Sequence, residues 1–256
     1  MRYCFSMSDE QTPLSFDFDL VKSAFDSRIM TYLETLDNLA SPDVSMARFG
    51  DSEIKMLSES FSIGFQQFDP KLQVRLLDVA ENPVDGLLVG FPPAFENEQW
   101  ASMWSRLFEK TVPKFKGHDR FANTAVSRPP CFNELGAEAV ELWQKVWDKR
   151  SVTVITGRGS RFDCRSELFD NASSVKLLST EPMNAFTNLD EIKDQISRNG
   201  KDDIYLISLG PAATVLAYDL HIDGYKALDV GHLTASYDYK FSGGLYPEKL
   251  KMVRPE

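Results

Sequence analysis

Two carboxylates separated by one residue follow an apolar alternation near the start of the chain. Asp51 and Glu53 stand in the stretch MARFGDSEIK (46–55), shortly after Val44 and Met46. In extended backbone the side chains of residues i and i+2 point to the same side, so both carboxylates could bind one hard cation; in a helix they would diverge by about 200°. A metal site therefore predicts a loop at this position.

The same residues have a structural interpretation that needs no ligand. Asp51 suits the N-cap of a helix, and the helix dipole would stabilise Glu53 in the first turn. The local pattern alone favours this cap slightly over the metal site, and the two can coexist. Arg48 at the end of the preceding strand has two interpretations as well: a buried ion pair with Asp51 or Glu53, or a clamp on a phosphate.

A glycine-containing loop later in the chain concentrates positive charge. The stretch TGRGSRFDCR (156–165) follows the strand VTVI, and Gly157 allows its backbone to approach an anion closely. It carries three arginines in an acidic protein, Arg158, Arg161 and Arg165. Phe162 stands where a dinucleotide fingerprint requires its third glycine, so that motif is excluded. An anion site and a plain turn with a solvated basic face fit this loop equally well.

Three further stretches place polar or small residues after strands. SLGPAATVLAYDL (208–220) opens a helix with Gly210, where first-turn amides could bind a phosphate or sugar, although Gly-Pro also simply starts helices well. His232 follows a short strand and a glycine, and its ring could act on a ligand or be structural. NTAVSRPP (123–130) places Ser127 and Arg128 ahead of two prolines, which predicts a loop.

Composition narrows the class of protein. The chain has 256 residues and a formal net charge of −10, which argues against a broad nucleic-acid surface. Its three cysteines, at positions 4, 131 and 164, are widely spaced and predict free thiols rather than a zinc site or disulfides. We find no apolar run of about 18 residues and no secretory signal, so we expect a cytoplasmic protein without a transmembrane segment. Membrane association through a lipid-linked substrate stays open.

These motifs need a scaffold that brings the ends of several strands together. Strands are predicted near 43–49, 86–91, 151–157, 174–179 and 203–210, and helices near 16–38, 52–60, 70–81, 97–112, 134–148, 188–198 and 212–221. This alternation predicts an α/β, Rossmann-like fold with a mainly parallel sheet and helices on both faces. We expect a single domain over 16–245, between a polar tail (1–15) and a C-terminal tail (246–256). Ligands of such sheets bind beyond the carboxyl ends of the strands, which is where the motifs lie.

Nine blocks, in order over roughly residues 40–240, resemble the GT-D fold glycosyltransferases, bacterial enzymes that move a sugar from a nucleotide-sugar donor. The blocks are ARFGDSE, FQQFD, LLVGFP, SRPP, VTVITGRGSRF, ELFDNASSV, PMNAF, ISLGPAATVLAYDL and GYKALDVGHL. The resemblance implies that Asp51 and Glu53 hold Mn²⁺, or Mg²⁺ in its place, against the donor diphosphate. It reverses the local preference for the cap, because a cation would stabilise the charge that gathers on a diphosphate leaving group.

The resemblance also implies roles for other residues. The expected catalytic residues are Asp51, Glu53, His232 and Asp238. The expected nucleotide-sugar-binding residues are Arg48, Gly50, Ser127, Arg128, Gly157, Arg158, Asn184, Gly210 and Asp229. One departure concerns the segment after GHL, where many relatives carry an Asp, another acid and an aromatic pair. This chain has TASYDY (234–239) there, so the role of acceptor base is absent or passes to Asp238.

The expected function is therefore that of a hexosyltransferase in cell-surface glycan biosynthesis. The donor would be UDP-linked, with UDP-glucose as the first candidate, and the acceptor a hydroxyl of a glycan, glycoprotein or lipid-linked glycan. One alternative is a non-catalytic module that binds a nucleotide or sugar phosphate, with Asp51 merely capping a helix. Another is a hydrolase that shares the metal, for which no water-activating group can be identified.

Overall fold

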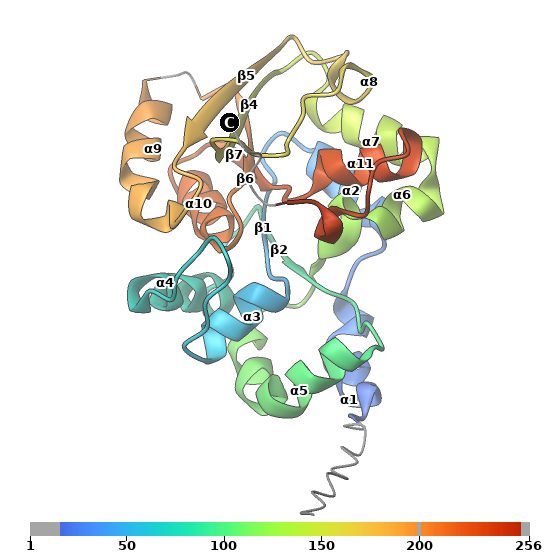
Figure 1. Ribbon diagram of the computed structural model, residues 1–256, viewed down its shortest axis with the longest axis vertical. Helices are drawn as coiled ribbons and strands as arrows, with labels where there is room; N and C mark the ends of the chain where they lie inside the picture. The colour runs from blue at the N-terminus through green and yellow to red at the C-terminus, as the bar shows by residue number, and fades with distance from the viewer. Residues whose placement is uncertain (1–15, 199–200, 252–256) are drawn as a thin grey trace, which may run out of the picture.

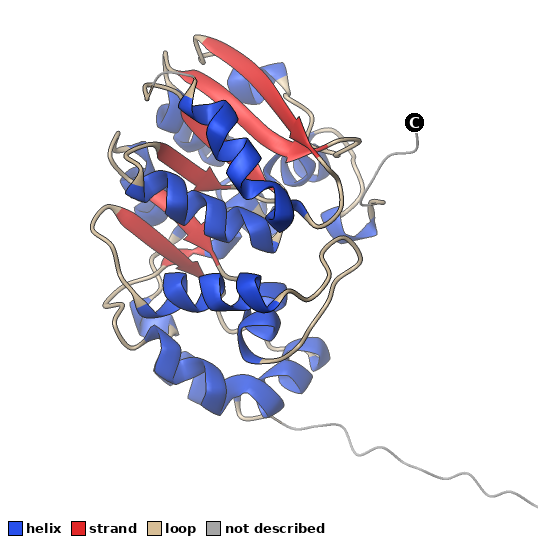
Figure 2. Ribbon diagram, turned by 90° about the vertical axis from the view of Figure 1, so that its left-hand side faces the viewer, coloured by secondary structure: helices blue, strands red, loops and turns tan. Residues whose placement is uncertain are grey.

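Seven strands form one parallel sheet with helices on both faces (Figures 1 and 2). The computed structural model describes residues 16–198 and 201–251, so the expectations for the tail 1–15, for Cys4 and for residues 252–256 lie outside it. The strand order is β3-β2-β1-β7-β6-β4-β5, and every pairing of neighbours in it is parallel. The expected Rossmann-like α/β fold is confirmed.

The elements alternate along the chain much as the sequence pattern predicts. The strands are β1 (Ser45–Arg48), β2 (Leu87–Phe91), β3 (Ala122–Asn123), β4 (Ser151–Gly157), β5 (Ser174–Thr180), β6 (Ile204–Ser208) and β7 (Lys226–Asp229). The helices are α1 (Phe18–Ala24), α2 (Tyr32–Ala40), α3 (Asp51–Ser58), α4 (Pro70–Glu81), α5 (Glu98–Thr111), α6 (Pro129–Leu135), α7 (Ala137–Trp147), α8 (Ser166–Phe169), α9 (Leu189–Ser197), α10 (Pro211–Ile222) and α11 (Leu233–Phe241). No helix in the described ranges combines the length and the apolar character needed to cross a membrane.

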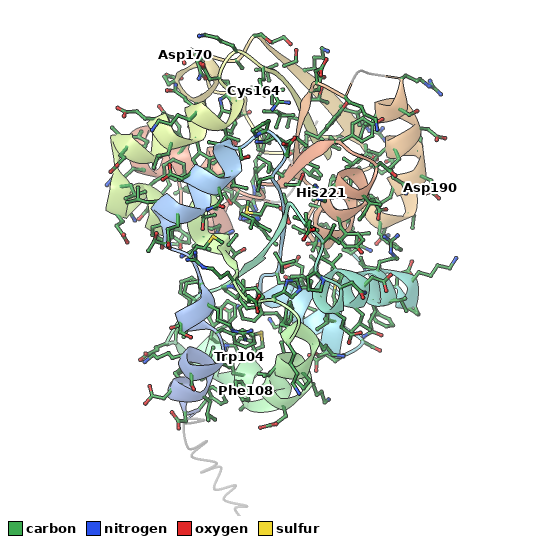
Figure 3. All side chains as sticks on the ribbon, turned by 180° about the vertical axis from the view of Figure 1, so that it is seen from behind. Trp104, Phe108, Cys164, Asp170, Asp190 and His221 are labelled. Atoms are coloured by element: carbon green, nitrogen blue, oxygen red, sulfur yellow. The ribbon has the colours of Figure 1, made fainter. Side chains whose placement is uncertain are left out.

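Alternate residues of the central strands pack into two separate hydrophobic cores, one on each face of the sheet. Ala47 of β1 packs with helices α3, α4, α5, α9 and α10 on one face, where Trp104 belongs to an aromatic cluster at the α5 end of the molecule (Figure 3). Met46 faces the other way and packs with helices α2, α6, α7 and α11. This alternation is what a parallel sheet covered on both faces requires.

Two expected elements differ from the structure. The helix expected over 16–38 is divided into α1 and α2, because Thr31 begins α2 with a capping box in which Glu34 reciprocates. The loop expected over 123–130 is a 3-10 turn (Thr124–Ser127) followed at once by α6. The two prolines open α6 instead of ending an element, because the first helical positions need no backbone N–H donor.

Strands β2 and β3 lie on one side of β1 in the sheet, and the strands from β4 to β7 lie on the other side. β1 and β7 are neighbours, but their ladder contains one aligned pair, Met46 with Leu228. After β1 the chain passes to α3 on one face of the sheet, and after β7 it passes to α11 on the other. The carboxyl ends of β1 and β7 therefore diverge at a topological switch point, where open α/β sheets bind their ligands.

The opposite end of β7 is fixed by a buried amine. Nζ of Lys226 donates to the carbonyl oxygens of Leu39 and Ser41, both at 2.6 Å, at the end of α2. Burial lowers the pKa of Lys226 to about 8, and the nearby Arg150 charge adds to this effect.

We predict that Lys226→Met lowers the free energy of unfolding by about 2 kcal/mol, because two buried carbonyl groups lose their donor. Lys110→Met removes the same charge from an exposed position of α5 and serves as the control. Urea unfolding at pH 7 measures both variants. Equal midpoints for the two would show that the Lys226 contacts do not support the fold.

Candidate functional site

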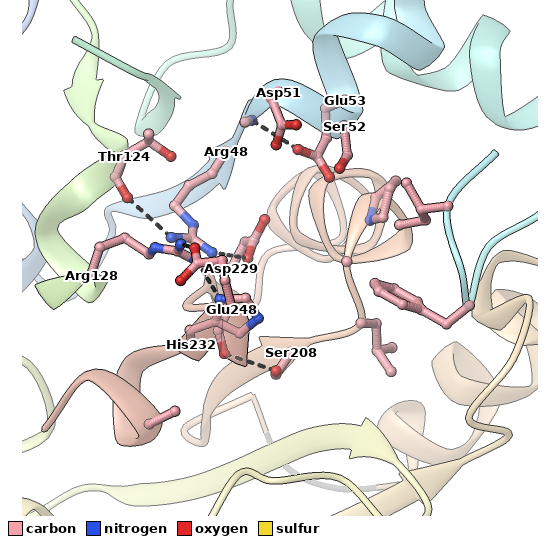
Figure 4. A pocket seen from close by; sticks show the side chains of 18 of the residues that line it. Arg48, Asp51, Ser52, Glu53, Thr124, Arg128, Ser208, Asp229, His232 and Glu248 are labelled. Atoms are coloured by element: carbon pink, nitrogen blue, oxygen red, sulfur yellow. Dashed lines mark hydrogen bonds and ion pairs between the residues drawn. The ribbon is translucent and has the colours of Figure 1, made fainter. Parts of the chain in front are cut away.

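A cavity of about 640 Å³ lies beyond the carboxyl ends of β1, β4, β6 and β7 (Figure 4). The N-terminal ends of α3, α10 and α11 border it. Most of the residues that the sequence singles out meet here. Those that line the cavity are Arg48, Gly50, Asp51, Glu53, Arg128, Gly157, Arg158, Gly210, Asp229 and His232.

The floor of the cavity is a buried ion pair at the switch point. Nη2 of Arg48, at the end of β1, donates to Oδ1 of Asp229, at the end of β7, over 2.8 Å. Only 11% of the Arg48 side chain and 6% of the Asp229 side chain are exposed. The expectation that Arg48 pairs with Asp51 or Glu53 is wrong, because parallel pairing puts the ends of β1 and β7 side by side.

Other polar groups form hydrogen bonds with this pair. Nη1 of Arg48 donates to the carbonyl oxygen of Thr124 over 3.1 Å and to Oγ of Ser127. Oγ1 of Thr214 on α10 donates to the carbonyl oxygen of Arg48 over 2.8 Å. The pair thereby ties β1 and β7 to α10 and to the turn before α6. Within the described part of the chain, Nε of Arg48 stays buried without a hydrogen-bond partner, so one donor of the pair is unsatisfied.

Two glycines make room for the Arg48 side chain. A Cβ atom on Gly231 would lie 2.2 Å from Nη2 of Arg48, and one on Gly90 would lie 2.9 Å from its Cγ. Gly231 also has a φ of +46°, which L side chains rarely adopt. The sequence did not lead us to predict a role for either glycine. The available signal was their position, since Gly90 lies near the end of β2 and Gly231 follows β7.

The D-x-E carboxylates lie in the first turn of α3 and not in a loop, so the loop expected for them is wrong. Gly50 is the N-cap, and Oε2 of Glu53 accepts a hydrogen bond from its backbone N–H over 2.8 Å. Asp51 is the first helical residue, and its Oδ2 accepts from Nζ of Lys55 over 2.9 Å and from Nε2 of Gln99 over 3.3 Å. Glu53 therefore caps the helix, whereas the sequence pattern predicted Asp51 as the capping residue.

Burial raises the pKa of two acidic groups on this side of the cavity. Burial, and then the charge of Asp229, raise the pKa of Glu53 to about 7, although backbone donors oppose the rise. Burial also raises the pKa of Asp229, against the opposing effect of the Arg48 guanidinium. Glu53 therefore exchanges a proton near neutral pH, where a bound cation would favour its ionised form.

Helical spacing alone would separate the two carboxylates, but Glu53 folds back to the Gly50 N–H at the start of α3. After burial and the charge of Asp229, the charge of Asp51 is a further cause that raises the pKa of Glu53. The two acids therefore lie near the same helix end. Within the described ranges, no group of three or more His, Cys, Asp or Glu side chains is arranged to hold a metal ion. The described residues alone therefore supply no complete coordination shell. Asp51 and Glu53 could supply the one or two carboxylates that Mg²⁺ uses when phosphate oxygens of a substrate complete its shell.

Basic side chains gather on the other side of Arg48 (Figure 4). The His232 ring lies between two guanidinium groups: Nδ1 contacts Nη1 of Arg128, and Nε2 lies 2.7 Å from Nη2 of Arg161. Burial, and then these two charges, hold the pKa of His232 well below its usual range. A neutral ring has one acceptor nitrogen, so it accepts a hydrogen bond from one of the two arginines, and the two positive charges oppose its protonation.

Arg128 and Arg161 differ in their neighbours but are both charged at neutral pH. Burial, and then the charge of Arg48, lower the pKa of Arg128 to about 10. Burial also lowers the pKa of Arg161. With Arg48, the two form a cluster of three guanidinium groups, referred to below as the arginine cluster. It concentrates positive charge within a protein whose net charge is −10.

Three residues expected at the site do not line the cavity. Asp238 on α11 pairs with Arg165 over 2.8 Å, and this ion pair turns its carboxylate away from the role of acceptor base. Ser127 is buried behind Arg48, where its carbonyl oxygen accepts from Ser236. Asn184 supports the loop before α4, since its N–H donates to the carbonyl oxygen of Phe65 over 2.8 Å.

The expected charge of the 156–165 loop is divided among separate partners. Arg161 enters the cavity, whereas Arg158 at its edge pairs with Glu181, and Arg165 pairs with Asp238. The cavity also contains residues that sequence reasoning did not select. These are an aromatic set, Phe65, Phe95 and Trp100, and two side chains from the C-terminal segment, Tyr246 and Glu248.

Comparisons with known proteins identify the family of this chain. Residues 46–245 match the family model "Glycosyltransferase GT-D fold". The chain is 30% identical over 228 residues to glycosyltransferase GlyD of Streptococcus pneumoniae, and 28% identical over 234 residues to a probable glycosyl transferase, Gly, of Streptococcus gordonii. These alignments cover 82% and 87% of this chain but only 27% and 34% of those two relatives. The chain thus spans about a quarter to a third of their length.

Solved structures resemble the chain over nearly all of its length. One, described as a conserved domain of unknown function 1792 with a distinct glycosyltransferase fold, has a TM-score of 0.77 at 30% identity and covers 93% of this chain and 90% of its own. Another, described as a new glycosyltransferase from Streptococcus sanguinis, has a TM-score of 0.71 at 28% identity and covers 84% of this chain and 85% of its own. With the family match over residues 46–245, these likenesses show that the chain belongs to the GT-D fold glycosyltransferase family.

Proposed function

We propose that this protein is a metal-dependent glycosyltransferase that moves a hexosyl group from a nucleotide sugar to a hydroxyl of a glycan, glycoprotein or lipid-linked glycan. UDP is the proposed nucleotide, with UDP-glucose as the first donor to test. The observation that carries the proposal is that the D-x-E carboxylates and the arginine cluster face one cavity at the switch point. The family to which the chain belongs supports the same reaction class.

The arginine cluster supplies the charge that a diphosphate needs. Arg128 and Arg161 line the cavity and stay protonated at neutral pH, so they can donate hydrogen bonds to phosphate oxygens. The start of α10 borders the cavity through Gly210 and Pro211 but adds little to anion binding, since proline has no N–H and the Ala213 N–H donates to the carbonyl oxygen of Gly210 over 2.8 Å. The arginine cluster would therefore bind the nucleotide and stabilise it as the leaving group.

The carboxylates of Asp51 and Glu53 would hold a divalent cation, Mn²⁺ or Mg²⁺, beside the diphosphate. When bound, the ion would stabilise the negative charge that develops on the leaving group. The Asp51 side chain is 35% exposed, and of its two partners Gln99 lines the cavity while Lys55 does not. Glu53 holds the N-cap of α3 with one oxygen, so it also fixes the helix end that carries Asp51.

A non-catalytic nucleotide-binding module is the second candidate function. It is favoured by one observation: neither residue considered as acceptor base is well placed, since Asp238 pairs with Arg165 and His232 lies between two guanidinium groups. Such a module would bind a nucleotide sugar without releasing the nucleotide. The following experiment separates the two candidates.

We predict Mn²⁺-dependent release of UDP from a UDP-sugar, and a loss of about a hundredfold in Asp51→Asn, because the cation loses an anionic oxygen ligand. Free nucleotide is measured with a panel of nucleotide sugars, with and without Mn²⁺. The matched control is Asp190→Asn, since Asp190 is also a first-turn acid with a lysine partner but lies fully exposed on α9 at the edge of the molecule (Figure 3). UDP binding without any turnover in the parent protein would favour the binding module.

We predict that Glu53→Gln changes how stability depends on pH. The pKa of Glu53 is about 7 in the folded protein and near 4.5 in the unfolded chain, so protonated Glu53 favours folding and this contribution is lost as pH rises toward and past 7. Between pH 5 and 8 the parent should lose about 2 kcal/mol relative to Glu53→Gln, allowing for screening by water in the cavity.

Glutamine keeps the hydrogen bond to the Gly50 N–H, so the helix cap is retained in this variant. Urea unfolding at pH 5, 6, 7 and 8 with a chelator present measures the difference. Parallel stability curves for the parent and the variant would show that Glu53 does not titrate in this range.

A further inference from the structure

The segment after α11 forms one wall of the cavity. Residues 246–250 were expected in a C-terminal tail, but Tyr246, Glu248 and Leu250 line the cavity. The Glu248 carboxylate forms an ion pair with Arg128. Nη1 of Arg161 donates to the carbonyl oxygens of Pro247 over 2.8 Å and of Leu250 over 2.7 Å. Two members of the arginine cluster therefore hold this segment in place.

The same two guanidinium groups are those proposed to bind a diphosphate. Within the described part of the chain, Glu248 is the one acidic side chain that forms an ion pair with Arg128. Half of the Glu248 side chain is exposed, so solvent screens the pair and it is held weakly. A phosphate group carries more charge and more acceptor oxygens than a carboxylate, and so competes well for a guanidinium.

The backbone before Glu248 is lightly packed at one point. Gly243 has a φ of +69°, and a Cβ atom built on it would have no neighbour within 4 Å. The next contacts along the chain are the Gly244 N–H, which donates to the carbonyl oxygen of Asp238 over 3.0 Å, and the Tyr246 ring, whose centroid lies 5.2 Å from that of Tyr239. Beyond Tyr246, Pro247 is buried, and the polar contacts described between residues 247–250 and the rest of the chain are those with Arg128 and Arg161.

We infer that Glu248 is a displaceable counter-ion of the diphosphate site. Its carboxylate neutralises Arg128, the donor diphosphate replaces it there, and residues 247–250 leave their place against Arg161. After transfer, Glu248 competes with the nucleotide diphosphate for Arg128 and so favours product release. This inference rests on the proposed function for the identity of the natural ligand, but it concerns any diphosphate that reaches the arginine cluster.

Binding to Glu248→Gln tests the inference. Isothermal titration with UDP, and separately with inorganic pyrophosphate, is carried out in the presence of Mn²⁺. The variant should bind both about fivefold more tightly than the parent, because the ligand no longer displaces an ion-paired carboxylate. Glu59→Gln is the matched control: it breaks the ion pair with Arg106 outside the cavity and should bind like the parent.

Limited proteolysis reports the displacement directly. Lys249 is an exposed trypsin site inside the segment. Pyrophosphate should speed cleavage after Lys249 in the parent, and Glu248→Gln should be cleaved quickly without any ligand. Protection of this site by pyrophosphate, or equal affinities in Glu248→Gln and Glu59→Gln, would overturn the inference. So would a failure of pyrophosphate to bind to the parent and to Glu248→Gln. If UDP binds to no variant while pyrophosphate shows these effects, the proposed nucleotide is wrong and the role of Glu248 stands.

Discussion

The buried ion pair between Arg48 and Asp229 is the constraint on which the site depends. It joins the ends of two neighbouring strands at the point where they diverge, and it is possible only because Gly90 and Gly231 leave space for the guanidinium. Removing either partner would leave an uncompensated charge in a buried place, at a cost of about 3–5 kcal/mol. The pair also separates the cavity into an acidic side and a basic side.

In the proposed function, this division would let an acidic protein bind an acidic ligand. The net charge of −10 would repel the proposed diphosphate at long range, whereas the arginine cluster would attract it at short range, where screening by salt matters less. On the acidic side, Glu53 titrates close to neutral pH because Asp229 and its own burial oppose ionisation. A cation bound beside Glu53 would therefore favour the ionised form of its carboxylate.

Local patterns were sufficient for most of the fold and for the location of the site. The helix at 70–81 and the parallel sheet follow from periodicity, and most of the motifs gather at the sheet end where parallel topology puts them. Partners distant in sequence were not predictable: Arg48 and Asp229 are 181 residues apart, and only strand order brings them together. The geometry of the D-x-E motif was not predictable, because one oxygen of Glu53 accepts a hydrogen bond from the Gly50 amide. The position of Glu248 was not predictable either, because its segment shows no periodic pattern of apolar residues.

The position of Glu248 in the chain has a consequence for how the family can vary. The region that matches the family model ends at residue 245, so the acids, the arginine cluster and the glycines around Arg48 lie inside it while Glu248 lies beyond it. A change at 248 alters no strand, no core contact and no proposed metal ligand. If Glu248 acts as inferred, substitutions in a few C-terminal residues would change the rate of product release while the residues that carry the chemistry stay the same.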